Sequence, residues 1–261
     1  MKTEYVCSDT IIGLFSAIYD AWISKKTEEE CGIAFRGNVE IELFCDYVEV
    51  EETEKKAHAV EKLIRKHLGM RTYGDIYYAS LSMDLKKGDA ILGTMLAAKN
   101  IPDSTKIMDY LSHPKVEKVF ELSRTVGSES HLLMGFVRYQ ELENGVLYSK
   151  ITPKSKVLTC IAPHFADRLP RENWMIHDQK HQMFVVHEAG KKWVLFEDEG
   201  FEIEVKLHLS ENEKEYAKLW KGFCKTIAIE SRNNPSCQRT HLPMRFRPNM
   251  VEFEDLRSVN S

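Results

Sequence analysis

The sequence predicts an α+β protein: a small N-terminal α/β unit and a helical segment, followed by a mixed antiparallel sheet with packed helices. Two observations predict this class. The first 70 residues alternate strand-like and helix-like patterns of apolar residues. From residue 135 onward, short alternating stretches are separated by turn signals, of which Asn144-Gly145 is the clearest. Apolar content of 43% and charged content of 29% are typical of a globular chain with a substantial core.

Two strands and two helices are expected in the first 70 residues. A short strand at residues 4–7 leads into Ser8-Asp9-Thr10, which supplies N-cap chemistry for a helix with an apolar face. Residues 39–50 alternate well enough for a second strand, with Val39, Ile41, Leu43 and Cys45 on one side. Thr53 begins the next helix, and Gly69 ends it.

The remaining elements are predicted from periodicity and turn residues. Residues 72–112 read as helical in three pieces, and a helix is expected over 115–132. Residues 135–140 and 145–151 form a predicted hairpin, 156–169 a helix, and 174–177, 183–187 and 192–197 three more strands. The predicted domains are a 1–112 α/β and helical region, a 113–232 α+β core, and a 233–261 extended basic arm.

The last long helix is predicted over residues 212–229, with one apolar face packed on a core. That face consists of Tyr216, Leu219, Trp220, Phe223 and Ile227. Trp174 and Trp193, like Trp220, are interpreted as core or domain-contact residues.

Charge and cysteine usage restrict the class of protein. The net charge is −4, but residues 1–60 carry a net −7 and residues 221–247 a net +5. The six cysteines are scattered without a CxxC pair, and no leader-like or membrane-spanning run is present, so we expect a cytoplasmic protein with free thiols. Cys237 and His241 alone are too few ligands for zinc, so no metal site and no cofactor are expected.

Arg124 and His131 are the first candidate site residues. They lie seven positions apart, hence on one face of the predicted helix, with Gly127 between them. Because glycine costs about 1 kcal/mol in a helix interior, Gly127 indicates close approach either of a ligand phosphate or of another backbone.

Arg138 and Phe136 share one face of the first predicted hairpin strand. An arginine beside an aromatic ring suits contact with an anion or with the plane of a base. A cross-strand ion pair is an equally good interpretation of Arg138.

His164, Asp167 and Arg168 form the third candidate group. His164 and Arg168 are four residues apart on one helix, and Asp167 could orient the imidazole for proton transfer on an anionic substrate. The neighbouring Phe165 offers a stacking ring. A polar histidine beside the core is the alternative, because the sequence contains no GxSxG, HExxH, Walker A or GxGxxG motif.

The basic C-terminal stretch is the fourth candidate. Arg232 and the run Arg245-Phe246-Arg247 combine positive charge with an aromatic ring, as in segments that follow a phosphate backbone. An arm folded back onto acidic residues is the rival interpretation.

Several longer stretches together resemble a bacterial protein family associated with DNA repair or DNA metabolism, whose core is a domain without an assigned function. The stretches are residues 122–131 (LSRTVGSESH), 135–142 (GFVRYQEL), 162–170 (APHFADRLP) and 173–178 (NWMIHD), with 220–223 and 229–234 near the end. Where the family often has Arg-Glu before the histidine, this chain has Ser128-Glu129-Ser130.

The resemblance implies a cytoplasmic protein that works with a radical S-adenosylmethionine partner thought to modify or repair DNA. Some relatives carry a uracil-DNA-glycosylase-like domain. The chain lacks a Cys-x3-Cys-x2-Cys triplet, so it is not expected to be the radical enzyme itself.

Three hypotheses follow. The first is a DNA-repair accessory protein that binds nucleic acid or a damaged nucleotide through Arg124, Arg138, Arg168, Arg232, Phe136 and Phe165. The second is a hydrolase or glycosylase-like enzyme that uses His164 and Asp167, with His131, in acid–base roles. The third is a structural adaptor whose acidic N-terminal region docks a basic partner.

Overall fold

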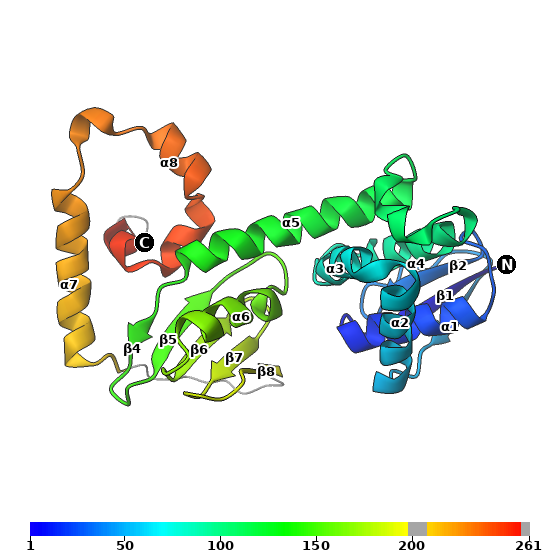
Figure 1. The fold of residues 1–261 in the computed structure, drawn as a ribbon, viewed down its shortest axis with the longest axis horizontal. Helices are drawn as coiled ribbons and strands as arrows, with labels where there is room; N and C mark the ends of the chain where they lie inside the picture. The colour runs from blue at the N-terminus through cyan, green and yellow to red at the C-terminus, as the bar shows by residue number, and fades with distance from the viewer. Residues whose placement is uncertain (198–207, 257–261) are drawn as a thin grey trace. The chain divides into compact units, whose positions relative to one another are not determined.

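The computed structural model describes residues 1–197 and 208–256 and confirms the α+β class. The chain divides into two compact units, an N-terminal unit (residues 1–128) and a C-terminal unit (residues 129–261). The division falls inside the long helix α5 (Pro114–Phe136), which the sequence assigns to the core domain. Figure 1 shows the elements of each unit.

The N-terminal unit is built on a three-stranded parallel sheet. Its strands are β1 (Lys2–Cys7), β2 (Cys31–Phe35) and β3 (Cys45–Glu49), in the order β2-β1-β3. The helices are α1 (Ile11–Ile23), α2 (Glu54–His67), α3 (Gly69–Ser80) and α4 (Lys87–Ala97), followed by the 3-10 turns η1 (Ala98–Asn100) and η2 (Ser104–Asp109). The core joins apolar residues of the sheet and helices, including Phe15, Ile33, Ile64 and Ile91.

The predicted helix ends are confirmed by their hydrogen bonds. The Thr10 hydroxyl accepts the Gly13 amide at 2.9 Å at the start of α1, and Thr53 accepts the Lys56 amide at 3.3 Å at the start of α2. Gly69 follows α2 with φ of +85°, the left-handed conformation that ends helices. These helix ends could be predicted from the sequence because each capping interaction joins residues no more than four positions apart.

The strand predicted over residues 39–50 is shorter than expected. Only Cys45–Glu49 pairs, because β1 offers a partner of just six residues. Phe44 has φ of +63°, which breaks the extended conformation, and Ile41 and Leu43, predicted on one side of the strand, are exposed. The alternation of apolar residues over 39–44 therefore does not mark a buried face.

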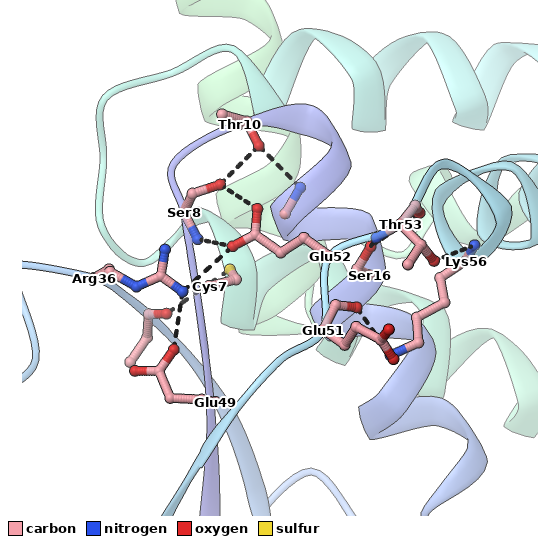
Figure 2. A network of polar contacts seen from close by, with 12 residues as sticks. Cys7, Ser8, Thr10, Ser16, Arg36, Glu49, Glu51, Glu52, Thr53 and Lys56 are labelled. Carbon is pink, nitrogen blue, oxygen red and sulfur yellow. Dashed lines mark hydrogen bonds and ion pairs between the residues drawn. The ribbon is translucent and has the colours of Figure 1, made fainter.

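A closed polar network fixes the carboxyl ends of the parallel strands (Figure 2). Glu52 accepts hydrogen bonds from the amide and the hydroxyl of Ser8, at 2.7 and 2.6 Å, and lies 3.6 Å from Arg36. Arg36 also pairs with Glu49 at 2.9 Å. Burial raises the pKa of the neighbouring Cys7 thiol to about 12. These contacts join the carboxyl ends of the three strands to the start of α1.

The C-terminal unit contains a five-stranded mixed sheet in the order β4-β5-β6-β7-β8. Its strands are β4 (Gln140–Glu141), β5 (Leu147–Ile151), β6 (Trp174–Asp178), β7 (Met183–His187) and β8 (Val194–Glu197). β5 and β6 are parallel and are joined by α6 (Leu158–Arg168), whereas the other neighbours are antiparallel. Trp174 of β6 and Phe165 of α6 are buried with ring centroids 6.4 Å apart and form part of the core of this unit.

The predicted hairpin is only partly present. Its Asn-Gly turn is confirmed, with Gly145 at φ +78° and its amide donating to the Leu142 carbonyl at 2.8 Å. The first strand is not, because α5 runs on to Phe136 and the Val137 amide still bonds to the Leu133 carbonyl. Arg138 thus lies in the connection after a helix, and its predicted strand placement is wrong.

The apolar face predicted for the last long helix does not pack on a core within the described residues. The helix, α7 (Glu211–Thr226), begins one residue before the predicted start at 212 and is capped by the Ser210 side chain, which accepts the Glu213 amide at 3.0 Å, but it has no buried residue. The outer stripe of α7 is exposed and consists of Tyr216, Leu219, Trp220, Phe223 and Ile227. Ser210 bonds to Glu141 at the start of the helix, and α7 also contacts η5, so periodicity indicated an apolar stripe but not what covers it.

The C-terminal arm, predicted to be extended, instead contains a short helix and several 3-10 turns. These are η3 (Glu230–Arg232), α8 (Pro235–His241), η4 (Met244–Asn249) and η5 (Val251–Leu256). Pro235 is compatible with α8 because it occupies the first turn, where its missing amide costs nothing. The Asn234 side chain caps the same helix by accepting the Cys237 amide at 3.0 Å.

Across the ranges 1–197 and 208–256, no helix is both long and apolar enough to cross a membrane.

A buried ion pair gives a stability prediction for the N-terminal unit. The Lys87 ammonium group is 2% exposed and lies 2.5 Å from Asp9. We expect Asp9→Ala to lower the free energy of unfolding by about 3 kcal/mol, because it removes the carboxylate facing a buried cation. Urea unfolding followed by circular dichroism measures the change.

The matched control is Asp109→Ala, which removes the partner of Arg71 in an exposed pair and should cost less than about 1 kcal/mol. Adding Lys87→Met to Asp9→Ala should restore part of the loss, because the uncompensated charge is then gone as well. Equal losses of unfolding free energy in Asp9→Ala and Asp109→Ala would contradict the stabilising role of the buried Lys87–Asp9 ion pair.

Candidate functional site

A basic hollow of about 610 Å³ lies in the C-terminal unit. Its walls come from the end of α5, from one side of α7, which we call the inner side, and from the segments α8, η4 and η5. The volume lies within the range of small-molecule and nucleotide sites. The lining residues that carry charge or an aromatic ring are Phe136, Arg138, Lys221, Lys225, His241, Arg247, Glu252 and Phe253.

Arg138 joins two walls of the basic hollow. Its guanidinium donates to the Glu252 carboxylate at 3.1 and 3.3 Å, and to the carbonyls of Gly135 and Val137 at 2.9 and 3.2 Å. Arg138 therefore stabilises the carboxyl end of α5 while it fixes η5. The ion pair predicted as an alternative is present, but its partner is on η5 rather than on a neighbouring strand.

Glu252 leaves one acceptor open. Its side chain is 12% exposed, and its second carboxylate oxygen is buried without a hydrogen-bond partner among the described residues. A buried carboxylate oxygen is costly to leave unsatisfied. A ligand N–H group that enters the basic hollow would satisfy it.

Arginine–aromatic contacts order the η4 and η5 walls. Arg247 lies over the Phe253 ring at 4.9 Å, and Arg245 lies over Phe246 at 4.5 Å. Phe246 in turn packs against Phe136 with ring centroids 5.2 Å apart. These contacts hold Arg247 and Phe136 in place as part of the lining.

The inner side of α7 supplies the remaining positive charge. Residues 221, 224, 225 and 228 line the basic hollow, and they are spaced as one helical face. The exposed outer stripe lies more than 90° around the helix, because successive residues turn by about 100°. One helix thus presents a basic face to the basic hollow and an apolar face away from it.

Three of the residues predicted from the sequence line this hollow, namely Phe136, Arg138 and Arg247. Arg124 belongs to the N-terminal unit, is exposed, and lies 5.6 Å from the Phe120 ring. His131 and Arg232 are exposed in the C-terminal unit. A Cβ at Gly127 would meet no atom within 4 Å, so no neighbour among the described residues explains that glycine by close approach.

The predicted group on α6 is divided between core and surface. Phe165 is 4% exposed and contacts Tyr139 and Trp174 edge-on, so its ring belongs to the core and is not free to stack on a ligand. Asp167 and Arg168 are exposed, and His164 is half-buried against Phe165. In the described residues no hydrogen bond joins His164 to Asp167, so the orientation that an acid–base pair needs is not formed.

The sequence did not reveal an aspartate–histidine pair that the fold does form. The Nδ1 atom of His181 lies 2.6 Å from the Asp178 carboxylate, and both side chains are buried. Asp178 also accepts the amides of Lys180 and His181, both at 3.1 Å. These bonds close the β6–β7 turn, and the short local spacing of the two residues was the only available signal.

No group of three or more potential metal ligands gathers anywhere in residues 1–197 and 208–256.

The comparisons with known proteins place the chain in one family. Residues 86–252 match a family described as a domain of unknown function, DUF4130. The chain belongs to this family. The DUF4130 match contains the sheet of the C-terminal unit and nearly all of the lining of the basic hollow, from Gly135 to Glu252. No curated protein matches the chain.

The Arg138–Glu252 contact gives a testable consequence. We expect Arg138→Ala to increase hydrogen exchange of residues 244–256 by roughly tenfold or more, because a charged hydrogen bond is worth about 1.5–3 kcal/mol. Hydrogen exchange followed by mass spectrometry reads this segment directly. Arg124→Ala is the matched control, since its exposed guanidinium lies outside the C-terminal unit. Unchanged hydrogen exchange in Arg138→Ala would rule out that Arg138 holds η5 against the end of α5.

Proposed function

We propose that the C-terminal unit binds single-stranded nucleic acid through the basic hollow and serves as an accessory protein in DNA repair or metabolism. The observation that carries the proposal is the lining, in which Arg138, Lys221, Lys225 and Arg247 surround one space with two phenylalanine rings. Proteins that bind single strands combine a positive groove for the phosphates with aromatic rings for the bases.

The separate lining groups suit different parts of a nucleotide. The lysines and Arg247 suit phosphate oxygens, since long cationic side chains neutralise phosphates and release counterions. Phe136 and Phe253 suit base stacking. The open carboxylate oxygen of Glu252 suits an exocyclic amino group, which only donates hydrogen bonds.

The role in a pathway rests on the resemblance seen in the sequence. We propose that this unit presents a strand to a radical S-adenosylmethionine partner, which would carry out the chemistry. Because His164 and Asp167 are not hydrogen-bonded, binding is favoured over a glycosylase-like reaction at that pair.

The outer stripe of α7 favours a second candidate function, that of an adaptor. Five large apolar side chains stand exposed on one side of α7, and exposed apolar patches of this kind mark protein-binding surfaces. The acidic region of residues 1–60, which the sequence predicts as a docking surface, belongs to the N-terminal unit, whereas α7 belongs to the C-terminal unit. An adaptor could hold a partner on the outer stripe and nucleic acid on the inner side of the same helix.

The binding proposal is tested by removing two cations from the basic hollow. We expect the double variant Lys221→Ala/Lys225→Ala to bind single-stranded DNA more weakly. The slope of log affinity against log salt concentration should fall by about 1.4, since each contact with a single strand contributes about 0.7. Fluorescence anisotropy with a labelled oligonucleotide at several salt concentrations measures both quantities.

The control is the double variant Lys66→Ala/Arg71→Ala, which removes two basic residues of the N-terminal unit. It should leave the affinity for DNA and the salt slope unchanged. Leu219→Ser/Phe223→Ser on the outer stripe should also retain DNA binding, whereas it should abolish co-purification with the radical S-adenosylmethionine partner if α7 is an adaptor surface. Absence of salt-sensitive binding by the wild-type protein would refute the nucleic-acid function.

A further inference from the structure

The C-terminal unit has a second cavity, next to the end of α6 and the turn between β7 and β8. It measures about 490 Å³ and is lined by Ala166, Pro170, His187, Gly190, Lys191, Lys192 and Trp193. None of these lining residues is acidic. We call it the His187 pocket.

His187 is a buried imidazole held from two sides. It is 3% exposed, and its ring stacks on Trp174 with centroids 4.9 Å apart and an interplanar angle of 10°. Its Nδ1 atom lies 2.9 Å from the Glu172 carbonyl oxygen. This combination fixes both the position and the plane of the ring.

The Glu172 carbonyl also fixes which nitrogen carries the hydrogen. A carbonyl oxygen can only accept, so Nδ1 of His187 must donate. In the neutral imidazole Nε2 then has a lone pair and is an acceptor. The other nitrogen has no hydrogen-bond partner within the described chain, so this oriented acceptor is available to a ligand in the His187 pocket.

The sheet register brings an indole to the same place. His187 pairs with Trp174 across β6 and β7. The β7–β8 register, continued by one residue beyond Val186 and Val194, sets Trp193 opposite His187. His187 and Trp193 both line the pocket. Trp193 is half-buried, so part of its ring is accessible for stacking.

The far wall is a turn fixed by hydrogen bonds. The Gly190 amide donates to the Pro170 carbonyl at 2.9 Å, and Gly190 has φ of +75°, which favours glycine. The Ala189 amide donates to the Asn173 side chain at 2.9 Å. Lys191 pairs with Glu188, whereas Lys192, in the described part of the chain, has no acidic partner. The Lys192 ammonium is therefore available to an anion.

We propose that the His187 pocket binds a nucleoside monophosphate unit. Nε2 of His187 would accept an N–H from the edge of the base, Trp193 would stack on the base, and Lys192 would contact the phosphate. The proposal deepens the proposed function by adding a base-recognition subsite apart from the basic hollow. The unit has two possible sources, a free mononucleotide or a nucleotide of a bound strand.

Calorimetric titration of the full chain with dAMP, dCMP, dGMP and dTMP, and with inorganic phosphate, tests the proposal. We expect saturable binding of at least one nucleotide and much weaker binding of phosphate. His187→Asn keeps an amide near Nδ1 but removes the acceptor at Nε2, so affinity should fall roughly three- to tenfold. Trp193→Ala should weaken binding roughly five- to a hundredfold through lost stacking.

Matched controls separate these losses from general damage. His164→Asn changes a half-buried histidine of α6 outside the pocket, and Trp220→Ala removes an exposed indole of α7, so both should bind like wild type. His187→Gln, whose longer side chain can bring an amide oxygen near the position of Nε2, should recover part of the affinity. Thermal unfolding establishes that each variant is folded.

The two sources and the two sites give different outcomes. Lys221→Ala/Lys225→Ala should lose strand binding and keep mononucleotide binding, so the basic hollow and the His187 pocket can fail separately. If an eight-residue strand displaces the mononucleotide, the pocket takes a nucleotide of the strand, and if both bind together it takes the free nucleotide. Absence of nucleotide binding, equal binding of phosphate alone, or binding indifferent to both His187→Asn and Trp193→Ala would overturn the proposal.

Discussion

The buried carboxylate of Glu129 is the contact on which the C-terminal unit depends. It is 3% exposed, accepts the amides of Lys154 and Ser155 at 2.9 Å each, and pairs with Arg245 at 3.1 Å. One side chain of α5 thereby holds both the loop that precedes α6 and the η4 turn. Charged hydrogen bonds in a buried position are strong, and loss of any partner leaves a charge unsatisfied. The η4 and η5 wall of the basic hollow follows from this anchor.

The polar network of the N-terminal unit and the two cavities of the C-terminal unit use their polar groups differently. In the N-terminal unit, Glu52, Ser8 and Arg36 satisfy one another at the sheet edge, so their contacts stabilise the fold. In the C-terminal unit, Glu252 keeps an unpartnered oxygen and His187 presents an oriented acceptor. A closed network adds rigidity, whereas an open donor or acceptor in a cavity offers specificity to a ligand. The open acceptors of Glu252 and His187 are the groups on which the two proposed ligand sites rest.

Local signals gave a reliable prediction of elements but not of the site. The caps at Thr10 and Thr53, the Gly69 helix end and the Asn144-Gly145 turn were predictable because each depends on residues close in sequence. Arg138 and Phe136 were recognised as candidates, and the net +5 of residues 221–247 pointed to the charge of the basic hollow. Their convergence with Glu252, more than 100 positions away, left no local trace.

The sequence by itself determined the α+β class, the order of most helices and strands, and where positive charge accumulates, because periodicity and capping act over short distances. Only the tertiary structure decided that Phe165 belongs to the core, that the apolar stripe of α7 is exposed, and that Trp174 and His187 stack across the sheet. Burial and pairing depend on which distant segments pack together. A hydrophobic or charged residue has the same local pattern whether it faces a core, a cavity or solvent.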